Sequence, residues 1–108
     1  MPDRRAEFLL LCSDLVKIRL ESVHPGPLLA NLEDISSSGA CLQLDRPLTV
    51  GTGISFRLGR HKFRGRTRYC LHNEIGYFVG IQFDASRKWS QDIYEPKHLL
   101  DPRRLFLK

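Results

Sequence analysis

Apolar and polar side chains alternate through most of the chain from residue 15 to residue 83, and this period of two is typical of half-buried β-strands. In the segment 15–20, the apolar side chains at positions 16, 18 and 20 would face the core, and the basic ones at 17 and 19 would face solvent. Turn residues such as Pro25 and Gly26 separate one alternating stretch from the next. The pattern predicts strands at 15–20, 28–35, 40–44, 54–58, 62–71 and 77–83.

Six short strands at this spacing favour a closed antiparallel β-barrel, because closure removes the exposed edges that would otherwise pair with other chains. After residue 84 the period changes. Ser86 is a suitable N-cap for a helix that begins at Arg87, and Pro96 would end that helix. Trp89 and Ile93 lie one helical turn apart and would face the barrel. We therefore predict an all-β fold, a six-stranded antiparallel barrel with a short C-terminal α-helix.

We expect a single domain over residues 1–108, with an N-terminal arm at 1–12, the barrel at 13–84, and the helix and tail at 86–108. A chain of 108 residues is close to the usual size of one domain, and 42% hydrophobic residues suffice for a core. The apolar side chains of the tail would pack on the barrel or on a second subunit. They are Leu99, Leu100, Leu105 and Phe106.

The chain is basic, with a net charge of +5 and a pI near 9.4, which suggests an anionic partner such as nucleic acid, a nucleotide or acidic lipid. The segment 62–71 would carry four cations on one strand face: Lys62, Arg64, Arg66 and Arg68. The opposite face, which we expect to be buried, carries Phe63, Thr67, Tyr69 and Leu71. Barrels that bind nucleic acid interleave basic and aromatic residues on the exposed face. We therefore interpret the cations as a solvated face and do not expect a nucleic-acid partner.

The cysteines Cys12, Cys41 and Cys70 are odd in number and widely spaced, so we expect buried thiols and no disulfide framework. No Cys-x-x-Cys pair is present, and Cys70 with His72 is only a weak indication of metal, so neither a metal nor a cofactor is predicted. The apolar run at 8–12 is too short to span a bilayer and lacks the features of a signal peptide. We expect a cytoplasmic protein without membrane insertion.

We do not predict an enzyme. The sequence has no carboxylate pair at a useful spacing, no Gly-x-Ser-x-Gly nucleophile turn and no phosphate-binding P-loop. Its histidines are scattered near predicted turns or in the tail, where polar surface positions are expected. They are His24, His61, His72 and His98.

The stretch 34–39, Asp-Ile-Ser-Ser-Ser-Gly, is a polar turn between the second and third predicted strands. A basic arm precedes the first strand, and the closing strand ends in Val-Gly-Ile-Gln-Phe at 79–83. A D-x-S-x-x-G turn at this place in a six-stranded pattern resembles the PilZ domain family, whose members are bacterial receptors for cyclic di-GMP. The resemblance extends from the arm to Trp89.

The resemblance implies a ligand site made of Arg4, Arg5, Asp34, Ser36 and Gly39. Arginine forks of the arm would bind N7 and O6 of guanine. Asp34 would accept hydrogen bonds from a guanine edge, Ser36 would donate to a phosphate or purine atom, and Gly39 would let the backbone turn without a Cβ clash. Bound ligand would order the arm and change the surface presented to a protein effector that the sequence does not identify.

The arm departs from the family pattern. Family members have Arg-x-x-x-Arg there, whereas Leu9 stands four residues after Arg5 in this chain. Loss of one bidentate arginine–guanine pair, worth roughly 1–3 kcal/mol, predicts binding that is about 10- to 100-fold weaker. The arm also becomes apolar at 9–11, which favours packing against protein.

Two functions follow from these observations. In the first, the chain binds cyclic di-GMP weakly and relays the signal to a protein partner. In the second, the chain is a degenerate PilZ domain that does not bind cyclic di-GMP and serves as a protein-interaction module, with a homodimer as one form. The apolar arm and tail would then be its contact surfaces.

Overall fold

The computed structural model describes residues 8–21, 26–85 and 88–103. One predicted strand, 28–35, has the same bounds in the structure, and each of the others lies inside a longer observed strand. The six strands are β1 (Leu10–Leu20), β2 (Leu28–Ile35), β3 (Gly39–Leu44), β4 (Gly53–Leu58), β5 (His61–Asn73) and β6 (Gly76–Phe83).

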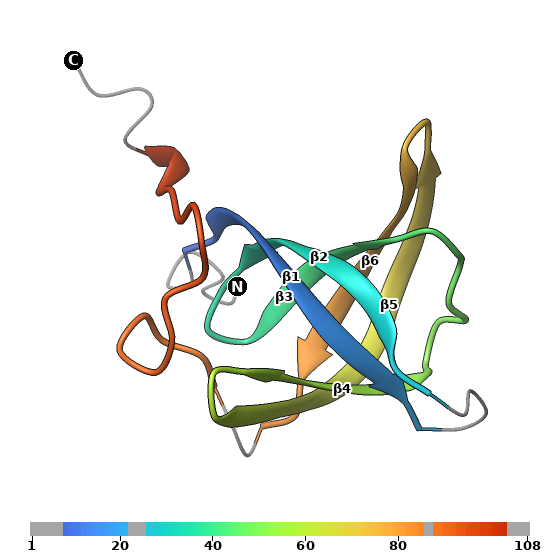
Figure 1. Cartoon of the computed structure of the whole chain (residues 1–108), viewed down its shortest axis with the longest axis horizontal. Helices are drawn as coiled ribbons and strands as arrows, with labels where there is room; N and C mark the ends of the chain where they lie inside the picture. Colours follow the sequence, from blue (N-terminus) through green and yellow to red (C-terminus); the bar gives the residue numbers. More distant parts are fainter. Residues whose placement is uncertain (1–7, 22–25, 86–87, 104–108) are drawn as a thin grey trace, which may run out of the picture.

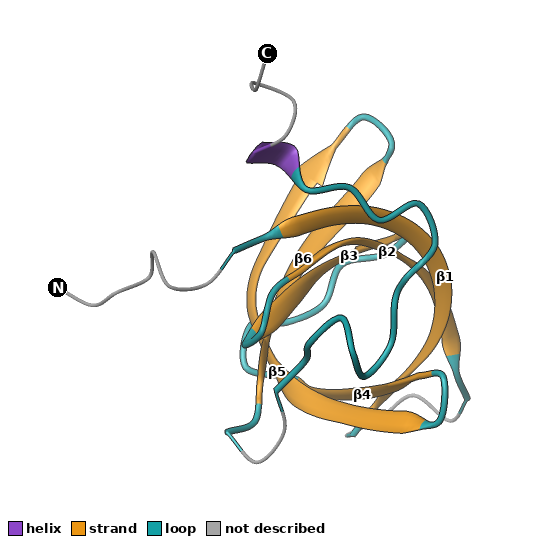
Figure 2. Ribbon diagram, turned by 90° about the vertical axis from the view of Figure 1, so that its left-hand side faces the viewer, coloured by secondary structure: helices purple, strands orange, loops and turns teal. Residues whose placement is uncertain are grey.

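The strands form a closed barrel in the order β1-β2-β3-β6-β5-β4, with β4 paired to β1, and every pairing is antiparallel. Figure 2 shows the strands as a ring around the core. The prediction of an all-β, six-stranded antiparallel barrel is confirmed.

Alternate side chains from all six strands fill the interior of the barrel, as the period of two requires. Three phenylalanines lie at its centre. The ring centroids of Phe63 and Phe83 are 5.0 Å apart, and Phe56 lies 6.0 and 6.2 Å from them. These separations are typical of packed aromatic rings. The strands of the barrel are therefore held in place by a closely packed core.

The predicted C-terminal helix is not found. Among the described residues of this segment, 88–103, the backbone forms turns and one short 3₁₀ turn at 102–103, with no α-helix. The predicted cap and first residue, Ser86 and Arg87, lie outside the described residues. Trp89 and Ile93 still pack on the barrel core, as expected. A short helix depends mainly on tertiary packing for its stability. In this segment an irregular backbone already places Trp89 and Ile93 against the core, so packing does not require a helix.

Backbone hydrogen bonds to the start of β1 replace the helix. The amide of Ser13 donates to the carbonyl of Lys97 at 3.0 Å. Leu11 and Leu100 exchange two backbone hydrogen bonds of 2.8 and 2.7 Å. The tail therefore packs on the barrel, and Leu99 reaches the core cluster. Leu105 and Phe106 lie outside the described residues.

The expected buried face of β5 ends earlier than predicted. Phe63 and Thr67 are buried, but Tyr69 is 43% exposed and Leu71 is 60% exposed. The register with β6 shifts between Thr67 and Tyr69, and such a bulge turns the following side chains to the other face. Beyond it, the β5–β6 hairpin extends past the rest of the barrel (Figure 1).

Candidate functional site

The turn between β2 and β3 is held to the rest of the barrel by its own backbone. The amide of Ser36 donates to the carbonyl of Gly39 at 2.8 Å, which closes the turn. The carbonyl of Ser37 accepts from the amide of Trp89 at 2.9 Å, and that of Ser38 accepts from the amide of Phe83 at 2.7 Å. The predicted motif is therefore a junction of β2, β3, β6 and the C-terminal segment.

A β-bulge turns Asp34 toward the surface. Strict alternation from Leu28 would place Asp34 on the buried face with Leu32. The register with β3 shifts between Leu32 and Asp34, so Ile35 takes the next core position with no exposed surface. Bulges re-aim side chains in this way beside functional sites. Asp34 is consequently half-buried at the edge of a surface pocket.

Gly39 is required by a close approach between strands. A Cβ atom at this position would lie 2.4 Å from the carbonyl oxygen of Ile81 on β6, a distance at which something must shift. Gly39 is not among the glycines with positive φ, so a left-handed conformation is not the reason for its presence. The motif predicts a glycine here because a Cβ atom would clash. The structure shows that the clash would be with the backbone of β6.

A pocket of about 190 Å³ brings three of the five predicted site residues together: Asp34, Ser36 and Gly39. Its remaining lining consists of Leu9, Ala40, Arg68, Tyr69, Gly80 and Ile81. Arg4 and Arg5 lie outside the described residues. Leu9 therefore lies at the same pocket as the D-x-S-x-x-G turn.

The carboxyl group of Asp34 sits in an unusual electrostatic setting. Burial raises its pKa to about 6, and the neighbouring charge of Glu33 acts in the same direction. A hydrogen bond from the amide of Cys41 opposes the rise. Among the residues that the structure describes, no cation lies within ion-pair distance of this carboxylate. Asp34 is thus mostly ionised at neutral pH, and none of the described cations forms an ion pair with it.

The hydroxyl of Ser36 is partly committed within the turn, where it donates to the carbonyl of Gly39 at 3.4 Å. This bond is long, and a hydroxyl rotates freely enough to serve another acceptor. A ligand oxygen at the mouth of the pocket would compete with the internal bond.

Sequence reasoning did not assign Arg68 and Tyr69 to the site. Tyr69 was expected in the core, yet its ring covers Gly80, where a Cβ atom would lie 2.1 Å from the ring carbon Cε2. A hydrogen bond links the hydroxyl of Tyr69 with the thiol of Cys41, and burial raises the pKa of this tyrosine to about 12. Arg68 donates to the side chain of Gln82. The clue in the sequence was Gly80 itself, since a glycine inside a strand often marks the close approach of another group.

The cysteines behave largely as predicted. Cys12 and Cys41 are buried free thiols, and Cys70 is half-buried. Burial raises the pKa of Cys12 to about 12 and that of Cys41 to about 11, so neither thiol is poised as a nucleophile. Within the described ranges, no group of three or more potential ligands could hold a metal ion. No helix in that part of the chain is long and apolar enough to cross a membrane.

In comparisons with known proteins, no protein-family model and no curated protein matches the sequence of this chain.

Proposed function

We propose that this protein is a PilZ-type receptor domain that binds cyclic di-GMP with reduced affinity and relays it to a protein partner. One observation carries the proposal: Leu9 of the arm lines the same pocket as Asp34, Ser36 and Gly39, although Leu9 and Asp34 are 25 positions apart in the chain. The β1–β2 ladder, in which Leu11 pairs with Asp34, produces this juxtaposition, and it brings the end of the arm beside the D-x-S-x-x-G turn.

The pocket provides complementary groups for one guanine. Ionised Asp34 accepts hydrogen bonds from the N–H groups of the base, and Ser36 donates to a phosphate or ring atom. Arg68 contributes a cation to the lining of the same pocket. Small-molecule sites usually enclose about 300–1,000 Å³. The described part of the pocket is smaller, at about 190 Å³, so we assign one base of the ligand to it.

Calorimetric titration with cyclic di-GMP, and with GTP as the control nucleotide, tests the proposal. We expect weak saturable binding by the natural chain and none by Asp34→Ala. Leu9→Arg restores the family pattern and should tighten binding by about 10- to 100-fold, since one bidentate arginine–guanine pair is worth roughly 1–3 kcal/mol.

Ile75→Arg is the matched control for Leu9→Arg. Ile75 is 69% exposed at the end of the β5–β6 hairpin and does not line the pocket, so this variant adds the same charge elsewhere. Equal tightening by both variants would show general attraction of a dianion and not an arm contact. No heat at several hundred micromolar cyclic di-GMP from either the natural chain or Leu9→Arg would end the proposal.

A specific observation also favours the degenerate, interaction-module reading. Three apolar residues at the start of the described chain are exposed: Phe8 by 51%, Leu9 by 45% and Leu11 by 36%. Leu100, which pairs with Leu11, is 40% exposed and continues this apolar surface. A homodimer built on it would appear in light scattering as a mass that doubles with concentration and falls in Leu9→Arg. A monomer at all concentrations that binds cyclic di-GMP would contradict this reading.

A further inference from the structure

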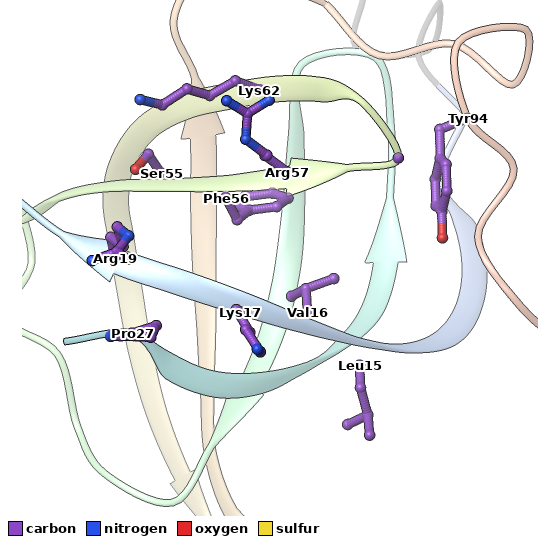
Figure 3. Close-up of a pocket in the computed structure, with 11 residues that line it drawn as sticks. Leu15, Val16, Lys17, Arg19, Pro27, Ser55, Phe56, Arg57, Lys62 and Tyr94 are labelled. Carbon is purple, nitrogen blue, oxygen red and sulfur yellow. The ribbon is translucent and has the colours of Figure 1, made fainter.

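A second, larger pocket opens where the barrel closes. β1 and β4 pair only over Ile18–Leu20 and Ile54–Phe56, and the two strands then separate. Figure 3 shows the ribbons diverging toward Tyr94, with Val16 and Phe56 between them. The resulting pocket has a volume of about 650 Å³, and we call it the seam pocket.

The floor and end wall of the seam pocket are apolar and fixed. Val16 and Phe56 are buried, with 7% and 4% of their surface exposed. Tyr94 forms the end wall, and its hydroxyl donates to Oδ2 of the buried Asp14 at 2.8 Å. The carbonyl of Tyr94 accepts from the indole Nε1 of Trp89 at 2.9 Å. Gly59 lies so close that a Cβ atom there would be 3.0 Å from Cδ1 of the tyrosine ring. This wall is therefore in place before any ligand arrives.

The rim carries four cations, Lys17, Arg19, Arg57 and Lys62, from three strands, and no acidic residue lines the pocket. Within the described part of the chain, no carboxylate lies within ion-pair distance of any of the four. The neighbouring Arg64, by contrast, is paired with Glu21 at 3.1 Å. The rim is therefore a concentration of uncompensated positive charge over a concave surface.

The register of the sheet makes this arrangement costly without an anion. Arg57 and Lys62 are direct cross-strand partners, and like charges in that relation repel. The guanidinium of Arg57 donates a long hydrogen bond of 3.4 Å to the carbonyl of Arg60. An oxyanion between the two side chains would replace repulsion with charge-assisted hydrogen bonds.

We propose that the seam pocket binds a phosphorylated ligand of nucleotide size, with its phosphates on the cationic rim and its ring in the apolar gap between β1 and β4. The volume lies within the range of about 300–1,000 Å³ that is usual for small-molecule sites. Arginine forks match phosphate oxygens bidentately, and Arg19 and Arg57 supply two of them. Single-stranded nucleic acid fits less well, because successive bases need a row of exposed aromatic faces, and the pocket offers one buried ring, Phe56, and one half-buried ring, Tyr94.

The seam pocket shares no lining residue with the pocket at Asp34, so the two proposals stand apart. Calorimetry of the whole chain with metal-free ATP and with pyrophosphate tests the inference. We expect saturable binding of both, with ATP tighter because its base fills the gap. Lys17→Gln combined with Arg57→Gln should weaken ATP binding by about tenfold or more. Asp34→Ala should leave ATP affinity unchanged.

Arg46→Gln combined with Lys88→Gln is the matched control. Both residues are exposed, lie outside the two pockets, and remove the same total charge. An equal loss of affinity in the two double variants would overturn the inference, since binding would then follow net charge. Equal affinities for pyrophosphate and ATP would overturn the assignment of a ring to the gap. Binding to an oligodeoxythymidine or to phosphatidylglycerol vesicles, without binding of ATP or pyrophosphate, would also overturn it.

Discussion

The pocket at Asp34 and the seam pocket differ in how the barrel produces them. At Asp34 the backbone folds back on itself through a bulge and a short turn, and backbone hydrogen bonds tie this turn to β6 and to Trp89. At the seam two strands fail to stay paired, and the cations around the gap have no acidic partners among the described residues. The first site is small and tied down, with one half-buried acid; the second is large and positively charged. The same barrel therefore forms one pocket where a bulge and a turn add backbone contacts, and another where two neighbouring strands lose their pairing.

The largest expected effect comes from the residue that joins the two regions. Trp89 donates its amide to Ser37 in the turn and its indole to Tyr94 at the seam, and it is 5% exposed. Trp89→Ala should lower the free energy of unfolding by about 3–5 kcal/mol, as expected for removal of a large buried side chain. Urea unfolding followed by circular dichroism measures the loss.

Trp89→Phe keeps much of the apolar volume and removes only the indole donor, so it should cost clearly less than Trp89→Ala. An equal loss of unfolding free energy in the two variants would show that packing of the Trp89 side chain does not stabilise the turn and the seam.

A smaller, pH-dependent effect on stability is expected from Asp34 in the turn. The pKa of Asp34 is raised from 3.8 to about 6, so the folded state holds the proton more tightly than the unfolded state. Ionisation of Asp34 therefore destabilises the folded state. This destabilisation is complete above pH 6, decreases as the pH falls from 6 to 3.8, and is absent below pH 3.8. Asp34→Asn should stabilise the fold at pH 8 by roughly 1–2 kcal/mol, allowing for the partial exposure of the side chain. At pH 3.5 the gain should vanish.

Thermal unfolding at the two pH values measures this difference, and the same variant should lose cyclic di-GMP binding. A gain of equal size at both pH values would show that the ionisation of Asp34 is not the cause.

The smallest effect belongs to the seam. Lys62→Gln removes the repulsion with Arg57 across the strands and should stabilise the fold by about 0.2–1 kcal/mol at low salt. The gain should shrink at 1 M salt, where charges on the surface are screened within about 3 Å. Arg64→Gln, on the same strand face, breaks the pair with Glu21 and should have the opposite sign. Equal and positive effects of both variants in denaturant titrations would contradict the difference described for these neighbouring cations.

The alternation of the chain predicts the barrel well, because each strand reports its buried face locally. The strand at 28–35 was predicted with its observed bounds, but β1 begins at Leu10 and not at residue 15, since the apolar run at its start hides the period. Bulges were not visible in the pattern, so the exposure of Tyr69 and the outward turn of Asp34 were not predicted from alternation.

The candidate sites were predictable to different degrees. Asp34, Ser36 and Gly39 follow one another in the chain, so a local motif was enough to single them out. The seam pocket combines β1, β4 and β5 with Tyr94, and only barrel closure brings these segments together. The predicted helix was wrong because the segment that contains Trp89 is shaped by hydrogen bonds to the turn and to β1, which no local period encodes.

The short ladder that closes the barrel, three residue pairs and the hydrogen bond from the amide of Glu21 to the carbonyl of Gly53, also bears on how the molecule behaves in a crowded solution. The joint between β1 and β4 is much shorter than the ladder between β5 and β6, so it is the place where transient local opening should begin. An opened ring becomes a curled sheet with two free edges, and such edges recruit strands from other molecules. Lys17 and Arg57 are exposed on the two strands that would become those edges, and their like charges oppose edge-to-edge association between copies. The solubility of the partly opened chain is therefore set in part by two side chains that flank its shortest ladder.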